Sequence, residues 1–266
     1  MANTPKNTIA RFLQFIRIIM IFVSSKINTM TTFKHSFILF SFLLVSFVSQ
    51  AQETVVRNLT AFHSVNVVGK MRVELYKSDT SRVEFTVSSV PAENLITTVT
   101  DSVLNIRLKT DNNKSAIFKV LVFYSKLTDV TVAVNALLVS PQILTGEKIN
   151  FEARTGAKME LELDIKNIEA NVKQGGILVF TGKTNRQKIE VNTGATYSAY
   201  KLSAEDTYVV ANAGSKAKVC ASRIIDVTSN TKSYVGYIGV PVSVITKTNL
   251  GGAIASFATE EDVFEE

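Results

Sequence analysis

One phrase occurs four times between residues 149 and 221: Phe151-Glu-Ala-Arg-Thr-Gly156-Ala, Ala170-Asn-Val-Lys-Gln-Gly175-Gly, Ile189-Glu-Val-Asn-Thr-Gly194-Ala and Val209-Val-Ala-Asn-Ala-Gly214-Ser. Its glycines lie 19, 19 and 20 residues apart, and apolar or small residues recur at alternate positions on both sides of each glycine. Such alternation around a fixed glycine predicts two short strands per repeat, joined by a bend. A period near 20 residues with no helical spacing predicts the stacked coils of a single-stranded β-solenoid (β-helix).

The apolar positions of the four repeats complement one another in size. Five residues before the glycines stand Phe151, Ala170, Ile189 and Val209, and five residues after them stand Leu161, Phe180, Ala199 and Val219. Large side chains therefore lie over small ones, as close-packed layers require. We expect structural roles for the bend glycines and for two asparagines that can hydrogen-bond along the stack. These residues are Gly156, Gly175, Gly194, Gly214, Asn192 and Asn212.

The remainder of the chain also favours strands over helices. Residues 54–127 contain short segments rich in Val, Ile, Phe and Thr between turn-forming stretches, but they show no repeat. Residues 128–257 contain the coils, beginning with a looser one in which Val132 stands 19 residues before Phe151. The sequence therefore predicts an all-β protein: a strand-rich N-terminal part running into a β-solenoid with coils of about 19 residues. Residues 258–266 form an acidic tail.

The first 51 residues have the features of an export leader. Lys34 and His35 precede an apolar run from Phe37 to Val48, and Ser49-Gln50-Ala51 is a small-x-small cleavage site, so we expect cleavage after Ala51. Met30 is a possible true start, and a long leader or an inner-membrane anchor is the alternative. The apolar runs are shorter than the roughly 20 residues of a spanning helix, which favours cleavage over an anchor, and we expect no stable membrane span after cleavage.

The charge balance excludes a polyanion-binding surface. Lys and Arg number 29 against 23 Asp and Glu, but five of the basic residues and none of the acidic ones lie within residues 1–51. The remaining 24 basic and 23 acidic residues leave the rest of the chain close to neutral. We therefore expect no nucleic-acid partner.

Residues that carry chemistry are scarce after Ala51. That part of the chain has one histidine, His63, one cysteine, Cys220, and no tryptophan. A histidine-rich metal site or a Cys–His nucleophile pair is hard to build from this set. The expectation is a protein that is not an enzyme, with no catalytic residue, metal ligand or cofactor.

Two sets of residues could face a ligand. Glu160, Glu162 and Asp164 alternate with leucines, which places all three on one outward strand face that could bind calcium or perform acid–base chemistry. The alternative is a solvated face with cross-strand ion pairs to residues such as Lys183. The second set comprises tyrosines of the later coils, which could form a stacking platform for sugar rings or pack in the core and corners. These are Tyr200, Tyr234 and Tyr237, whereas the repeat register directs Tyr197 inward.

Several segments resemble one protein family. They are Phe62-x-x-Val65-x-Val67-x-Gly69, residues 103–107, Thr155-Gly156-Ala157, Thr193-Gly194-Ala195 and Val235-Gly-Tyr237-Ile-Gly239-Val-Pro241. The chain resembles the putative auto-transporter adhesin family called the head GIN domain, over roughly Val56 to Ile254. This resemblance implies a secreted or periplasmic all-β protein of bacterial envelopes, with a strand-rich first part and a β-solenoid.

These observations together predict an exported protein of a Gram-negative-type envelope, in the periplasm or on the outer surface. Its expected function is that of an adhesin or scaffold whose partner is an unknown protein or a surface glycan. A homo-oligomer formed through the solenoid ends is possible, because uncapped solenoid ends can stack. The alternatives are a periplasmic binding module for an envelope signal and, from another class, a β-helix enzyme that acts on polysaccharide.

Overall fold

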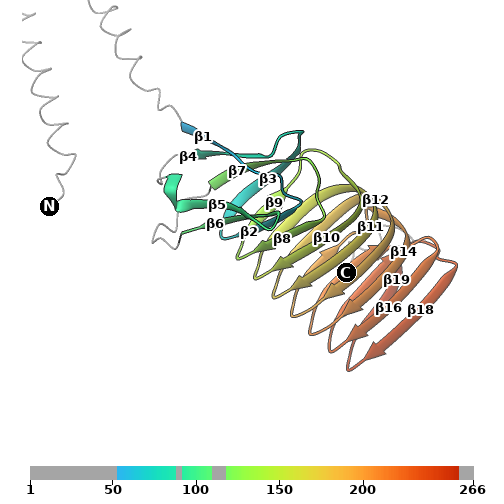
Figure 1. The fold of residues 1–266 in the computed structure, drawn as a ribbon. Helices are drawn as coiled ribbons and strands as arrows, with labels where there is room; N and C mark the ends of the chain where they lie inside the picture. The colour runs from blue at the N-terminus through green and yellow to red at the C-terminus, as the bar shows by residue number, and fades with distance from the viewer. Residues whose placement is uncertain (1–52, 88–91, 110–117, 258–266) are drawn as a thin grey trace, which may run out of the picture. The chain divides into compact units, whose positions relative to one another are not determined.

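The computed structural model of the chain describes residues 53–87, 92–109 and 118–257 (Figure 1). The predicted leader and the acidic tail lie outside the described residues. Within them the protein is all-β and forms a solenoid of about seven turns with coils of about 19 residues, which confirms the predicted fold class. The described residues contain no helix that is both long and apolar enough to cross a membrane.

The N-terminal strands are β1 (Glu53–Asn58), β2 (Ser64–Val68), β3 (Met71–Lys77), β4 (Arg82–Val87), β5 (Leu95–Thr100), β6 (Val103–Leu108), β7 (Phe118–Tyr124), β8 (Asp129–Ala133) and β9 (Leu137–Val139), with one 3-10 turn, η1 (Ala92–Asn94). The later strands are β10 (Leu144–Arg154), β11 (Lys158–Lys173), β12 (Ile177–Val191), β13 (Thr196–Ser198), β14 (Leu202–Ala211), β15 (Lys216–Cys220), β16 (Ile224–Asn230), β17 (Tyr234–Ile238), β18 (Ser243–Asn249) and β19 (Ala253–Phe257).

The strands stack in parallel to give two long faces. The first face consists of β6, β2, β8, the C-terminal halves of β10, β11 and β12, and then β14, β16 and β18. The second face consists of β7, β3, β9, the N-terminal halves of β11 and β12, and then β13, β15, β17 and β19. Strands β11 and β12 are long because each continues round a corner from the second face to the first.

The parallel stack extends beyond the part in which the sequence shows a repeat. Strand β2 lies between β6 and β8, and β3 lies between β7 and β9. The coil formed by β6 and β7 therefore lies on the far side of the β2–β3 coil, and the chain then returns to start β8. The order of coils in space thus differs from their order in the sequence.

The coil that begins with β8 has a different register from the one predicted. Val132 pairs with Ala153, and not with Phe151, so that β8 and β10 are 21 residues out of phase. The additional two residues leave the inward and outward alternation unchanged, since side chains in a strand alternate with a period of two. Val132 remains buried for this reason.

The bends between the first and second faces are turns with two consecutive positive φ angles. Thr155 and Gly156 have φ values of 52° and 71°, and Thr193 and Gly194 have 53° and 65°. Positive φ at both central positions defines a type I′ turn, in which glycine adopts the second position at little cost. Each turn is closed by a hydrogen bond, as from the Ala195 amide to the Asn192 carbonyl at 3.3 Å. The bends also join along the stack, since the Gly175 amide donates to the Thr193 carbonyl of the next coil.

The predicted inward columns form one continuous core. All eight side chains predicted at five residues before and after the glycines are buried. Their size complementarity gives ring contacts between coils, with centroids 4.8 Å apart for Phe151 and Phe180 and 5.8 Å apart for Phe180 and Tyr197. Tyr197 points inward as the register predicts and is fully buried.

A buried polar network interrupts this apolar core. The Tyr197 hydroxyl donates to Gln187 Oε1 at 2.7 Å, and Gln187 Nε2 donates to Thr207 Oγ1 at 3.0 Å. Thr207 Oγ1 in turn donates to the carbonyl oxygen of Cys220 at 2.8 Å. Burial raises the pKa of Tyr197 far above its ordinary value, so the phenol remains a hydrogen-bond donor at all physiological pH values.

Candidate functional site

The three predicted carboxylates lie on the second face and point outward. Glu160, Glu162 and Asp164 are exposed, while Leu161 and Leu163 between them are buried. Glu160 forms an ion pair with Lys158, and Asp164 lies 3.2 Å from Lys183 on the neighbouring coil. Among the described residues no group of three or more His, Cys, Asp or Glu side chains could hold a metal ion. Two of the three carboxylates, Glu160 and Asp164, therefore take part in ion pairs on this face.

The three predicted tyrosines do not form an open platform. Tyr200 is only 8% exposed and packs beside Ile238 and Phe257, which corrects the expectation that it faces a ligand. The reason is Gly236, where an added Cβ would lie 2.6 Å from the Tyr200 hydroxyl, so the absent side chain makes room for the ring. Tyr234 and Tyr237 are partly buried, and Tyr237 packs against the main core.

The outer surface of the first face contains a groove that the sequence did not indicate. It has a volume of about 610 Å³ and crosses strands β8, β10, β11, β12 and β14. The groove contains residues of the outward columns that lie six and four positions before each bend glycine. Its polar lining comprises Asp129, Thr131, Asn150, Glu152, Glu169, Asn171, Lys188, Glu190 and Tyr208.

Hydrogen-bond acceptors predominate in this groove. Four of its side chains are carboxylates and one is a lysine. In addition, the amide oxygens of Asn150 and Asn171 are buried and accept no hydrogen bond from any described residue. An unsatisfied buried acceptor costs about 1–3 kcal/mol. A ligand that brings hydrogen-bond donors between these columns would therefore be favoured.

Asp129 is held as an anion at the N-terminal end of the groove. Burial raises the pKa of this carboxyl, but hydrogen bonds from Asn150, Thr128 and Ser64 outweigh that effect and hold the pKa below its ordinary value. Nδ1 of His63 lies 3.1 Å from the hydroxyl oxygen of Ser64 and 3.1 Å from that of Thr128. In the catalytic triad of a hydrolase the aspartate contacts the histidine, and the histidine contacts the serine. Asp129 instead contacts the hydroxyls of Ser64 and Thr128, so these groups are not arranged as such a triad.

Ion pairs neutralise two of the other carboxylates. Lys148 lies 2.8 Å from Glu169, and Lys173 lies 3.0 Å from Glu152. Both lysines lie on strands that form the groove, β10 and β11, and they reduce its negative charge. The groove is consequently rich in acceptor atoms but carries much less net charge than its carboxylates alone would give.

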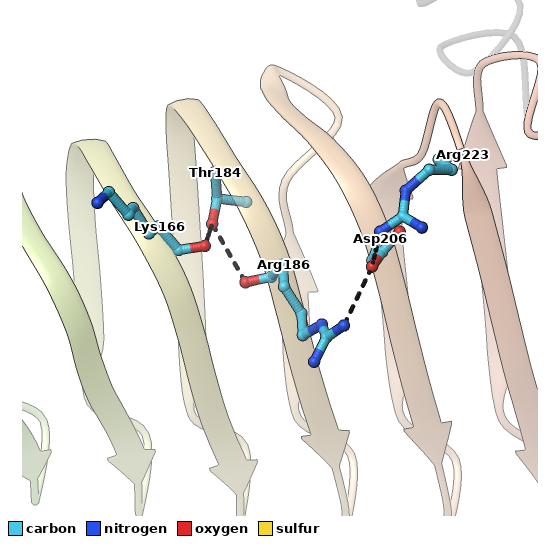
Figure 2. A network of polar contacts seen from close by, with 5 residues as sticks. All are labelled: Lys166, Thr184, Arg186, Asp206 and Arg223. Carbon is cyan, nitrogen blue, oxygen red and sulfur yellow. Dashed lines mark hydrogen bonds and ion pairs between the residues drawn. The ribbon is translucent and has the colours of Figure 1, made fainter.

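Figure 2 shows a cluster of two arginines and an aspartate, which lies beside the groove residue Tyr208. Asp206 Oδ2 lies 3.4 Å from an Nη atom of Arg186 and 2.5 Å from one of Arg223. The three residues come from successive coils, and the Asp206 side chain is only 2% exposed. Arg186 also faces the groove residue Tyr208, with its guanidinium carbon 5.8 Å from the ring centroid.

Backbone contacts fix the corner from which Arg186 extends. The Thr184 hydroxyl lies 3.2 Å from the Lys166 carbonyl oxygen and 3.1 Å from that of Arg186, as Figure 2 shows. The Arg223 amide donates to the Glu205 carbonyl at 2.9 Å. Sequence reasoning missed this cluster because it started from acidic residues that are close together in the sequence. The relevant signal was the alignment of Arg186 with Asp206 across neighbouring coils.

The fold defines the class of the protein as an all-β solenoid with polar outer faces. The chain belongs to the family described as putative auto-transporter adhesin, head GIN domain, whose model matches residues 61–241. This match confirms the resemblance found in the sequence, and it supports an adhesin-like protein.

Solved structures share this fold. A putative adhesin from Bacteroides fragilis has 12% sequence identity and a TM-score of 0.70, covering 79% of this chain and 98% of its own. A putative adhesin from Parabacteroides merdae has 16% identity and a TM-score of 0.62 with the same coverage. A protein from Parabacteroides distasonis described as a putative lipid binding protein has 14% identity and a TM-score of 0.62, again over 79% and 98%. No curated protein matches the chain.

Proposed function

We propose that the protein is an exported adhesin that binds a surface glycan in the groove of the first face. The observation that carries this proposal is the combination, in one groove, of a partly exposed tyrosine with buried amide oxygens that lack a donor. Sugar hydroxyls are hydrogen-bond donors, and the apolar face of a sugar ring stacks on an aromatic ring. The adhesin-like family membership supports a binding role.

The same contacts favour a binder over an enzyme. Glu152 and Glu169 are engaged by lysines, and Asp129 accepts hydrogen bonds that keep its pKa low. A general acid requires a raised pKa, which burial or a neighbouring carboxylate provides in glycosidases. The shift of the Asp129 pKa is in the opposite direction. The protein therefore retains its glycan and does not cleave it.

Removal of the groove tyrosine tests the proposal. The full-length protein would be screened on an array of bacterial surface oligosaccharides, and the affinity for each hit measured by calorimetry. Tyr208→Ala is expected to weaken binding about tenfold, equivalent to about 1.4 kcal/mol. Tyr76→Ala is the matched control, since Tyr76 is a partly exposed tyrosine on the second face that stacks on Phe123. Equal losses in the two variants, or shortening of the oligosaccharide during incubation, would contradict the proposal.

We also propose that the protein is exported from the cytoplasm. The leader predicts processing after Ala51, so the mature chain begins at Gln52 and resides in the periplasm or on the outer surface. Intact mass of the protein from fractionated cells measures this directly. A chain that retains residues 1–51 in the cytoplasmic fraction would contradict export.

A further inference from the structure

The arginine cluster beside the groove has an unusual distribution of charge. Two guanidinium groups contact the same carboxylate oxygen of Asp206, so the three side chains together carry one net positive charge. Asp206 is buried, whereas the side chains of Arg186 and Arg223 are 56% and 54% exposed. The buried anion thus holds two cations next to each other at the surface.

This geometry leaves donors directed at solvent. A guanidinium has five N–H donors, and the contact with Asp206 uses a terminal nitrogen of each arginine. Two adjacent guanidinium groups bind a carboxylate or a sulfate through several charge-assisted hydrogen bonds. The cluster also costs little to organise on binding, because Asp206 already orients both side chains.

The cluster continues the groove. Arg186 lies two residues before Lys188 on β12, and Asp206 lies two residues before Tyr208 on β14. Two residues of a strand span about 6.6 Å, roughly the length of one sugar ring. Lys188 and Tyr208 both line the groove. A glycan whose ring rests on Tyr208 therefore places its next substituent beside the two arginines.

We propose that Arg186 and Arg223 form an anion subsite that binds the carboxylate or sulfate of one acidic sugar, while the neutral part of the same glycan lies in the groove. This inference rests on the proposed function of the groove. A uniformly acidic polysaccharide is excluded as a ligand, because the groove presents Asp129, Glu190 and further carboxylates to the rest of the chain. The ligand thus carries its acidic group at one position.

Calorimetry with three oligosaccharides of one backbone tests the subsite. The first is neutral, the second carries a terminal carboxylate and the third a terminal sulfate. The full-length protein is expected to bind the acidic forms about tenfold more tightly than the neutral one, and the advantage shrinks with added salt. The acidic form that binds more tightly shows whether the subsite prefers a carboxylate or a sulfate.

Variants separate binding from stability. Arg223→Gln is expected to abolish the advantage of the acidic forms and to leave the affinity for the neutral form unchanged. A merely structural ion pair would instead lower the melting temperature and weaken all three ligands alike. If the Arg223→Gln variant fails to fold, the Arg186→Gln variant replaces it in the same measurements. Arg154→Gln is the control, because Arg154 lies 3.7 Å from Glu152 on the other side of the groove.

The possible results distinguish the subsite from the groove. Equal affinity for neutral and acidic forms in the unaltered protein would overturn the subsite and leave the proposed function intact. If no oligosaccharide binds, the proposed function fails. The anion subsite is then tested separately by titrating the protein with inorganic sulfate and following the NMR signals of the arginine Nε–H groups. Saturable shifts of Arg186 and Arg223 at tens of millimolar sulfate would support it. No shift, or shifts at other arginines alone, would overturn it.

Discussion

Gly194 shows how one backbone conformation fixes a bend of the solenoid. Its φ is 65°, and an added Cβ would meet no atom within 4 Å. Substitution therefore tests the backbone alone, without a steric clash. Gly194→Ala is expected to lower the free energy of unfolding by about 1–2 kcal/mol, the cost of a left-handed conformation for a residue with a Cβ. Urea denaturation measures the change.

Asparagine at the same position supplies the comparison. Asn tolerates positive φ better than Ala, so Gly194→Asn is expected to cost less than Gly194→Ala. Asn135 and Lys232 occupy the corresponding positions of other coils with φ values of 57° and 58°. If the two variants lose the same free energy of unfolding, the cost does not depend on how well the residue tolerates a positive φ, which would contradict the prediction.

Tyr197 illustrates the cost of polar groups inside the core. Tyr197→Phe removes the donor to Gln187 Oε1, which is fully buried. The expected loss is about 1–3 kcal/mol in the free energy of unfolding, because a buried acceptor loses its partner. Thermal and urea unfolding of the variant would measure it.

A second substitution identifies the cause of that loss. Replacing Gln187 by Met in the Tyr197→Phe background removes the stranded acceptor and keeps a similar volume, so part of the lost stability is expected to return. If the double variant is less stable than Tyr197→Phe by the full cost of Gln187→Met alone, the two residues are not energetically coupled.

At the scale of elements, an asparagine ladder connects the later coils. Asn212 donates to Asn192 at 2.8 Å, Asn230 donates to Asn212 at 2.8 Å, and Asn249 donates to Asn230 at 2.7 Å. Asn212 thus takes part in two of these bonds, whereas Asn249 takes part in one.

The position in the ladder predicts the energetic effect of a substitution. Asn212→Ala is expected to cost about 1–3 kcal/mol, since each hydrogen bond contributes about 0.5–1.5 kcal/mol net. Asn249→Ala is the matched control with about half that cost. Urea denaturation of both variants tests the ranking, and a larger loss for Asn249→Ala would contradict a ladder role.

The repeated coils were predictable because each strand pairs with its counterpart one coil later in the sequence. Gly156, Gly175, Gly194 and Gly214 preserve that spacing, and the inward columns follow from it. The N-terminal coils lack such a signal. Asn66 pairs with Asn105 at a separation of 39 residues, and Ser64 with Asp129 at 65. A fixed period cannot reveal a stack whose spatial order differs from its chain order.

The groove was not predictable for a related reason. Its floor is assembled from two outward residues of each of five coils, and successive members of one column, such as Glu169, Lys188 and Tyr208, share no residue type. Outward columns are free to vary because no packing constraint acts on them. Glu160, Glu162 and Asp164 were conspicuous because they are close in sequence, but a binding surface on a solenoid forms across coils rather than along one strand.

At the scale of the whole molecule, the two ends of the described stack differ. Antiparallel strands continue the faces at the N-terminal end, where β5 pairs with β6 and β4 pairs with β7. Strands β18 and β19 each pair with one neighbour among the described residues. Five of the nine exposed large hydrophobic residues in the described part lie within residues 240–250. Within the described residues, the C-terminal end thus combines strand edges that pair with no further strand with exposed apolar side chains.

Such an end predicts concentration-dependent self-association through the last coil. Ile245 lies on β18 and is 54% exposed, so Ile245→Lys is expected to shift the protein toward the monomer. Ile143→Lys is the control, with 50% exposure away from this end. Light scattering after size-exclusion chromatography measures the mass, and a protein that is monomeric at every concentration would contradict the prediction.

The proposed function places the glycan in the groove of the first face. A crystal structure of the protein with an acid-terminated oligosaccharide from the array tests it most directly. We expect a sugar ring on Tyr208, hydroxyls directed at Asn150 and Asn171, and the acidic group between Arg186 and Arg223. An oligosaccharide bound on the second face, near Glu160 to Asp164, with the groove empty would contradict it.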